Sequence, residues 1–339
     1  MRRGLAVLLV IAFMLSAGGC GQSGSAAKTS PGRLQIVCTI FPIYDWVKEI
    51  LGERADEVEV TLLMKNGADL HSYQPTLWDM KKIAEADLFL YVGGESDFWV
   101  EDVLSNLEGK GHALNLVEIL GYRVMEEMHL EGMQKRPGEE EHEHGEAEYD
   151  EHVWLSLRNA KEACQAIAET LCELEEEYAG LYGENLRVYK EKLDALDREY
   201  QKVTKEREAE PVLLFGDRFP FRYLAEDYGL TCYAAFAGCS AETEASFSTI
   251  AFLAGKAGEL KLPVILSIDG SDQKISRTIA SNTSTRDQKV LVLDSMQSVS
   301  EDDIENGESY LGIMERNLEV LKEALGPAMI GTRHTDTEL

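Results

Sequence analysis

Two histidines and two aspartates have the types and positions to hold a metal ion together. His71 lies in the segment ADLHSYQP and His152 in the segment YDEHVWL. Asp217 directly follows an apolar run, and Asp294 ends another. Neutral imidazoles and carboxylates form a nitrogen and oxygen donor set that suits a divalent first-row ion. Two carboxylates that met without a cation would raise the pKa of one of them, so the set itself favours a bound metal.

Apolar, β-branched runs alternate with helical patterns along the chain. Four runs in each half predict strands, at residues 34–40, 58–64, 87–93 and 112–116 and then at 212–216, 230–236, 264–268 and 290–294. Apolar residues with helical spacing fill the intervals. This alternation predicts an α/β fold with two lobes, each a parallel four-stranded sheet flanked by helices. Ligands of such sheets bind outside the carboxyl ends of the strands, which is where the four candidate residues fall.

A long helical pattern lies between the two halves. Its apolar residues step alternately by four and three, at Tyr182, Leu186, Tyr189, Leu193, Leu196, Tyr200 and Val203. This spacing is also typical of a coiled-coil dimer. Its place between two α/β halves instead favours one long rigid helix over residues 181–207 that joins the lobes, and we expect a monomer. At a rise of 1.5 Å per residue the pattern spans roughly 35 Å.

The N-terminus has the composition of an export signal. Arg2 and Arg3 precede an apolar run too short to cross a bilayer, and small residues then lead to Cys20. Small residues directly before a cysteine resemble the bacterial lipoprotein signal, in which that cysteine is lipidated. An ordinary cleaved signal is the alternative. We therefore expect an extracytoplasmic protein anchored to the cell membrane through Cys20.

These patterns divide the chain into six parts. We assign residues 1–20 to the lipoprotein signal peptide, 21–33 to a flexible tether, 34–180 to an N-terminal lobe, 181–207 to the linking helix, 208–326 to a C-terminal lobe and 327–339 to a tail.

Charge and cysteine content narrow the classes of partner. Sixty-one acidic residues against 33 basic ones give a formal net charge of -28, which repels nucleic acid and attracts cations. No CxxC motif or Cys/His zinc cluster is visible in the sequence. Cys232 and Cys239 form the only local pair worth testing as a disulfide, and buried free thiols are the simpler expectation for most of the cysteines.

Four segments resemble the metal-binding solute-binding proteins of ATP-binding-cassette importers. These are DLHSYQPT at 69–76, DEHVWLSLRNA at 150–160, FRYLAEDYGL at 221–230 and VLVLDS at 290–295. The resemblance implies a two-lobed receptor that holds zinc, manganese or iron and passes it to a membrane permease. It assigns His71 and His152 as the first two ligands and Asp294 as the last.

In the family that this chain resembles, the third metal ligand is generally a His or Glu five residues before the tyrosine that matches Tyr223. Counting back five residues leads to Arg218, which cannot coordinate a cation. One extra residue in the segment DRFPF would bring Asp217 to that place, and we select Asp217. Glu242 and Glu244 are the alternative metal ligands, and Arg218 is then expected to pair with a carboxylate.

Residues 139–152 form an acidic, histidine-containing loop. Its 14 residues include eight acids and three histidines, with no Lys or Arg. Such a segment favours a solvated loop beside the site. His142 and His144 are candidates for weak capture ligands of a metal-capture loop, and a charged insertion without a role is the alternative.

A receptor for Zn²⁺ is the leading hypothesis, with Mn²⁺ or Fe²⁺ as the alternative metal. The sequence shows no GxSxG, P-loop, GxGxxG after a strand or HExxH motif, so we expect no enzymatic activity. An exported metal-dependent hydrolase, with Glu242 or Glu244 as the base, is the alternative of another class. A surface adhesin would bind no metal tightly.

Overall fold

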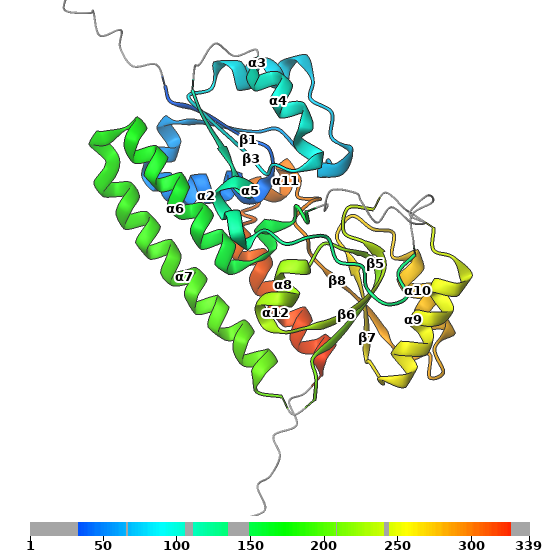
Figure 1. Ribbon diagram of the computed structural model, residues 1–339. Coiled ribbons are helices and arrows are strands. Elements are labelled where there is room, and N and C mark those ends of the chain that lie inside the picture. Colours follow the sequence, from blue (N-terminus) through cyan, green and yellow to red (C-terminus); the bar gives the residue numbers. More distant parts are fainter. Residues whose placement is uncertain are drawn as a thin grey trace, which may run out of the picture. The chain divides into compact units, whose positions relative to one another are not determined.

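The computed structural model describes residues 33–65, 67–105, 111–134, 149–207, 209–240 and 244–326. The chain divides into the units Met1–Arg33 and Leu34–Leu339, and the fold concerns the second. It contains two four-stranded sheets whose strand pairs are all parallel (Figure 1). The predicted α/β fold is therefore confirmed. Among the described residues, none of the helices combines the length and apolar character needed to cross a bilayer.

The first sheet has the strand order β2-β1-β3-β4. Its strands are β1 (Gln35–Cys38), β2 (Glu59–Leu62), β3 (Leu88–Tyr91) and β4 (His112–Asn115). The helices of this part are α2 (Phe41–Leu51), α3 (Leu77–Glu85), α4 (Phe98–Ser105) and α5 (Leu116–Leu120). Helix α3 begins at a capping box, in which the Thr76 side chain accepts from the Asp79 backbone N–H and Asp79 accepts from Thr76.

The second sheet has the strand order β6-β5-β7-β8. Its strands are β5 (Val212–Phe219), β6 (Thr231–Ala237), β7 (Val264–Ile268) and β8 (Lys289–Leu293). The helices are α8 (Arg222–Tyr228), α9 (Phe247–Glu259), α10 (Lys274–Asn282), α11 (Glu301–Glu305) and α12 (Tyr310–Leu325). Short 3₁₀ turns complete the described part, at Gly52–Glu57, Leu70–Ser72, Glu95–Asp97, Gly121–Arg123, Val153–Leu155 and Glu176–Tyr178.

Strand β5 is longer than the sequence predicts. The apolar run ends at Gly216, but the strand continues to Phe219, which is buried and pairs with Ala237 of β6. The register shifts between Phe215 and Arg218, and pairing with β6 resumes at Arg218, opposite Phe236. Asp217 therefore lies within the strand and does not follow it, which corrects the predicted strand end.

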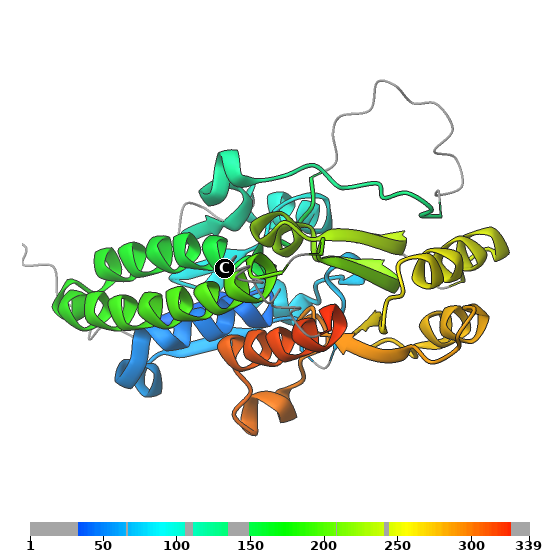
Figure 2. The same ribbon diagram turned by 90° about the horizontal axis from the view of Figure 1, so that it is seen from below.

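Helix α7 (Ala179–Lys205) is the long helix that joins the lobes. It begins at Ala179, two positions before the predicted start at residue 181. It runs beside α6 (Leu157–Leu174), as Figures 1 and 2 both show, and contacts α2 of the first lobe and α8 and α12 of the second. The apolar seam predicted from the sequence is buried at Tyr182, Leu186, Tyr189, Leu193, Leu196 and Tyr200.

The two sheets share one large apolar core, and each sheet also contributes to a smaller buried cluster of its own. This core includes Ile36 and Leu88 of the first sheet and Phe215 and Leu266 of the second. Tyr310, at the start of α12, packs edge-on against Trp46 of α2 with ring centroids 5.1 Å apart. Side chains of both lobes thus pack together in the shared core.

Candidate metal centre

His71 is carried by the 3₁₀ turn Leu70–Ser72, which follows β2. Asp69 caps this turn, because its Oδ1 accepts a hydrogen bond from the His71 backbone N–H at 2.9 Å. The same carboxylate forms an ion pair with Arg218 of β5, whose Nη2 lies 2.7 Å from Asp69 Oδ2. Arg218 is therefore paired with a carboxylate, as the sequence predicts, and the pair ties the turn to the second sheet.

His152 is fully buried just before the turn Val153–Leu155. Its backbone N–H and its Nδ1 both lie at hydrogen-bond distance from Asp150 Oδ1, at 2.9 and 3.0 Å. A carboxylate oxygen accepts hydrogen bonds, so His152 Nδ1 carries a proton and donates it to Asp150. The lone pair of Nε2 then points away from Asp150. Carboxylate support of this kind is typical of metal-bound histidines.

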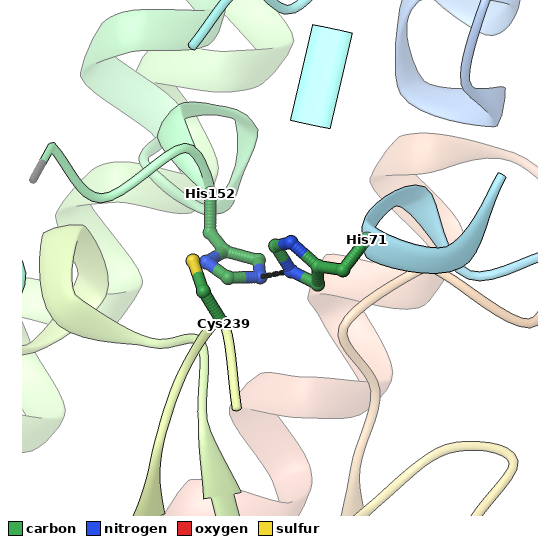
Figure 3. A group of neighbouring side chains, drawn as sticks. All are labelled: His71, His152 and Cys239. Atoms are coloured by element: carbon green, nitrogen blue, oxygen red, sulfur yellow. Dashed lines mark hydrogen bonds between the residues drawn. The ribbon is translucent and has the colours of Figure 1, made fainter. Parts of the chain in front are cut away.

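The two histidine rings face each other. His71 Nε2 and His152 Nε2 are 3.2 Å apart, and the rings are tilted by 59° (Figure 3). The other nitrogen of His71, Nδ1, lies 2.8 Å from the Ser96 hydroxyl and 3.5 Å from Glu151 Oε2. With both Nδ1 atoms facing partners, both Nε2 atoms are directed at the same point. The two Nε2 atoms share a hydrogen bond here, and a cation placed between them would have one nitrogen donor from each ring.

Glu151 is an acidic side chain buried beside His71. Only 2% of its surface is exposed, and its Oε1 accepts from the Ser96 backbone N–H at 2.8 Å. Burial raises the pKa of this carboxyl. Its Oε2 has no hydrogen-bond donor among the described residues apart from the longer contact with His71 Nδ1. The carboxyl group thus lies beside the His71 imidazole, with one oxygen facing its Nδ1.

Cys239 completes the cluster from the loop that follows β6. One nitrogen of each histidine ring and Cys239 Sγ all lie within 4.8 Å of one another (Figure 3). Burial raises the pKa of this thiol well above its ordinary value, and the carboxylates of Asp150, Glu127 and Glu151 add to the effect. Among the described residues, this is the group of His, Cys, Asp and Glu side chains gathered closely enough to hold an ion.

The sequence does not reveal this role of Cys239. No CxxC or Cys/His spacing exists, because the three residues come from positions 71, 152 and 239 of the chain. Cys232 and Cys239 are both free, so the disulfide considered for them is not formed, and the expectation of free thiols is confirmed for the described cysteines. One available signal was the position of Cys239 just beyond the carboxyl end of a strand, where ligands bind.

Asp217 and Asp294 are placed outside the histidine cluster. Asp217 lines a cavity of about 520 Å³ together with His71. Its two carboxylate oxygens accept from the Ser267 hydroxyl at 2.7 Å and from the Arg218 backbone N–H at 2.9 Å. Asp294 follows β8, and its Oδ1 accepts from the Met296 backbone N–H at 2.7 Å. Burial, with the charge of Asp269 nearby, raises its pKa.

The other predicted residues are not part of the described cluster. Glu244 is exposed, and its backbone carbonyl accepts from Gln134 Nε2 at 3.2 Å. Cys20, His142, His144 and Glu242 lie outside the described residues.

A second cavity, of about 230 Å³, opens beside the cluster. Its lining is strongly acidic and comprises His71, Glu95, Ser96, Glu127, Tyr149, Glu151 and Cys239. Carboxylates concentrated in such a recess raise the local concentration of cations. The recess therefore suits the approach of a metal ion to the two imidazoles.

Comparisons with known proteins match the chain to a family and to curated relatives. Residues 36–324 match the profile of a family described as ZnuA, zinc-uptake complex component A, periplasmic. The zinc-binding lipoprotein AdcA of Streptococcus pneumoniae is 30% identical over 93% of the chain, although the chain spans only 61% of that relative. The high-affinity zinc uptake system protein ZnuA of Bacillus subtilis is 29% identical over 94% of the chain and 97% of its own length.

Solved structures share the fold. The Zn(II)-bound ZnuA-like domain of Streptococcus pneumoniae AdcA superposes with a TM-score of 0.67 at 28% identity, covering 87% of this chain and 99% of that domain. The metal-dependent lipoprotein YcdH of Bacillus subtilis gives a TM-score of 0.69 at 28% identity, covering 86% and 99%.

Proposed function

The chain belongs to the ZnuA family of periplasmic zinc-uptake components, and from this membership we propose that it is an extracytoplasmic solute-binding protein that captures Zn²⁺. It delivers the ion to the membrane permease of an ATP-binding-cassette importer. His71 and His152 bind the ion through their Nε2 atoms. The protein acts as a receptor and has no catalytic turnover.

The observation that carries this proposal is the separation of the two imidazole nitrogens. In a tetrahedral zinc site with zinc–nitrogen bonds of 2.0–2.1 Å, two nitrogen ligands are about 3.3 Å apart. His71 Nε2 and His152 Nε2 lie 3.2 Å apart, with Asp150 and Ser96 facing their Nδ1 atoms. The two donors thus already have the spacing that a zinc ion requires.

Manganese and iron are the alternative metals for the same site. Carboxylate and water ligands favour Mn²⁺, whereas imidazole suits zinc and iron. In the described part of the chain, the closest cluster contains no carboxylate ligand. This donor set favours Zn²⁺ as the cargo.

The experiment is a calorimetric titration of the metal-free protein with Zn²⁺ and, separately, Mn²⁺. We expect about one zinc ion per chain, with binding lost in His71→Ala and in His152→Ala. His112 is exposed on β4, so His112→Ala is the matched control and should bind zinc like the parent. Zinc binding that survives in both site variants would overturn the proposal. Hydrolysis of ester or peptide substrates by the zinc-loaded protein, lost in His71→Ala, would favour the hydrolase alternative.

We also propose that Cys20 carries the lipid anchor. The arginines and the apolar run before it support this, and relatives such as AdcA of Streptococcus pneumoniae are named lipoproteins. The native protein should then fractionate with membranes, whereas Cys20→Ala should not. Membrane association that is unchanged by this substitution would contradict the anchor.

The acidic loop is proposed to collect ions for the site. His142 and His144 lie among the acids of residues 139–152. Deleting residues 139–148 should leave the zinc affinity of the cluster unchanged and slow zinc association in stopped-flow measurements at limiting zinc. Loss of the high-affinity event itself would show that the loop belongs to the site.

A further inference from the structure

Cys239 is the third side chain of the cluster that contains His71 and His152. It follows β6 by two residues, at the carboxyl end of a strand of the second sheet, whereas His71 and His152 belong to the first lobe. Its Sγ and one nitrogen of each ring lie within 4.8 Å of one another. We propose that the Cys239 sulfur binds the metal as a thiolate and makes the centre a two-histidine, one-cysteine site. This inference rests on the proposed zinc-binding function.

The distances agree with a site that tightens around its ion. Zinc–sulfur bonds of 2.3 Å and zinc–nitrogen bonds of 2.0–2.1 Å place sulfur and nitrogen ligands about 3.5 Å apart. The ligand atoms of the cluster lie within 4.8 Å of one another, so a small movement of Sγ would bring it to bonding distance of an ion held by the two imidazoles. On binding, the S–H bond breaks, a sulfur–metal bond forms, and the proton passes to solvent.

The local backbone is built to bring Cys239 to the histidines. At Gly238, an added Cβ would lie 2.9 Å from the Phe219 carbonyl oxygen and 3.1 Å from His152 Cε1, so the loop approaches His152 as closely as it does because residue 238 has no side chain. The backbone N–H of Cys239 donates to Glu127 Oε1 at 3.1 Å, and both residues line the acidic recess. These two contacts fix the residue in place.

The residues predicted from the sequence for this ligand position form other contacts. Arg218 pairs with Asp69, and both carboxylate oxygens of Asp217 accept hydrogen bonds, from Ser267 and from the Arg218 backbone. The cysteine is not engaged in a disulfide. Of the described donors, Cys239 is the one that lies with the two imidazoles.

A thiolate changes which metals the centre retains. Sulfur ligands favour zinc and other soft or borderline ions, whereas Mn²⁺ prefers oxygen ligands. The centre should therefore discriminate strongly against Mn²⁺. Replacing the sulfur by oxygen should weaken zinc binding and reduce this preference.

The test uses Co²⁺ as a spectroscopic substitute for zinc in the full chain under reducing conditions. The parent should show the intense near-ultraviolet charge-transfer band of a cobalt–thiolate bond. Cys239→Ser should lose this band and bind zinc at least about tenfold more weakly, since even the loss of an outer-shell partner costs 10–100-fold. Cys232 is buried on β6 outside the cluster, so Cys232→Ser is the matched control and should keep both properties.

The outcomes separate the two proposals. A parent that binds zinc through His71 and His152 but whose cobalt spectrum and zinc affinity are unchanged in Cys239→Ser would overturn the thiolate ligand alone. Failure of the parent to bind zinc would overturn the proposed function as well. Circular dichroism of metal-free Cys239→Ser, compared with the parent, shows whether the variant folds, and Cys239→Ala provides a second variant that offers no oxygen ligand.

Discussion

The indole Nε1–H of Trp154 donates a hydrogen bond of 2.9 Å to the backbone carbonyl of Ser295. Trp154 lies in the turn before α6, and Ser295 lies in the loop after β8. The Trp154 carbonyl in turn accepts from the Tyr310 hydroxyl at 2.7 Å. Two buried hydrogen bonds at one residue therefore connect the His152 segment of the first lobe with two segments of the second.

Removing this indole donor should destabilise the protein. Trp154→Phe leaves the buried Ser295 carbonyl without its partner, which costs about 1–3 kcal/mol, in addition to the loss of packing. We expect a lower midpoint of thermal unfolding. Trp78 is half-exposed, with 49% of its surface accessible, so Trp78→Phe is the control and should change the midpoint little. Equal midpoints for Trp154→Phe and the parent would show that the bond contributes nothing.

Asp150 should control zinc affinity without binding the metal. Its carboxylate orients the His152 ring through Nδ1, at 3.0 Å. Asp150→Asn removes the negative charge behind the imidazole, and we expect zinc affinity to fall by about 10–100-fold. Calorimetry would measure the change, with the exposed Asp287→Asn as a control of equal charge. An unaltered dissociation constant in Asp150→Asn would mean that the carboxylate has no part in positioning the ring.

Gly238→Ala should disturb the cluster locally. The added methyl group would press on His152 Cε1 and on the Phe219 carbonyl, at 3.1 and 2.9 Å. We expect weaker zinc binding together with retention of the fold, as judged by circular dichroism. Gly255 lies in α9, where an added Cβ meets nothing within 4 Å. Gly255→Ala should bind zinc normally and be more stable by up to about 1 kcal/mol, because alanine has the higher helix propensity.

Asp45 should make stability depend on pH. Burial raises its pKa to about 7, although its carboxylate accepts from the Tyr310 backbone N–H at 2.9 Å. Between the ordinary pKa of an aspartate and about 7, the folded state binds more protons than the unfolded state, so this group lowers stability as the pH rises through that range.

Asp45→Asn removes this pH dependence while keeping an oxygen acceptor. Relative to the parent, the variant should gain free energy of unfolding between pH 4 and pH 8, by about 1–2 kcal/mol after allowance for screening at a partly accessible site. Urea unfolding at the two pH values would measure it. A difference between variant and parent that is the same at both pH values would contradict the raised pKa.

Much of the fold could be predicted from the sequence. Apolar runs identified the eight strands, and the steps of four and three from Tyr182 to Tyr200 identified the helix that joins the lobes. Strand ends were less certain, because β5 passes through the polar residues Asp217 and Arg218 by means of an irregular register. The periodicity of apolar residues indicates which residues are buried. It does not indicate where strand pairing resumes after a bulge.

The site was predicted in part. His71 and His152 were found because each stands in a recognisable segment, and the structure brings them together. Cys239 was missed because the cluster is assembled from three distant segments, and free thiols without a ligand role were expected for most of the cysteines. Asp217 and Asp294 lie outside this cluster. Their assignment as metal ligands therefore stays a prediction from the sequence alone.

The shared interior of the two lobes has a consequence for unfolding. Residues of both sheets and of α7 belong to the largest apolar cluster, so loss of packing in one sheet exposes apolar surface of the other. The protein should therefore melt cooperatively as a single body, with equal calorimetric and van't Hoff enthalpies, in spite of its two sheets. Two resolved heat-capacity peaks would mean that the halves are energetically independent.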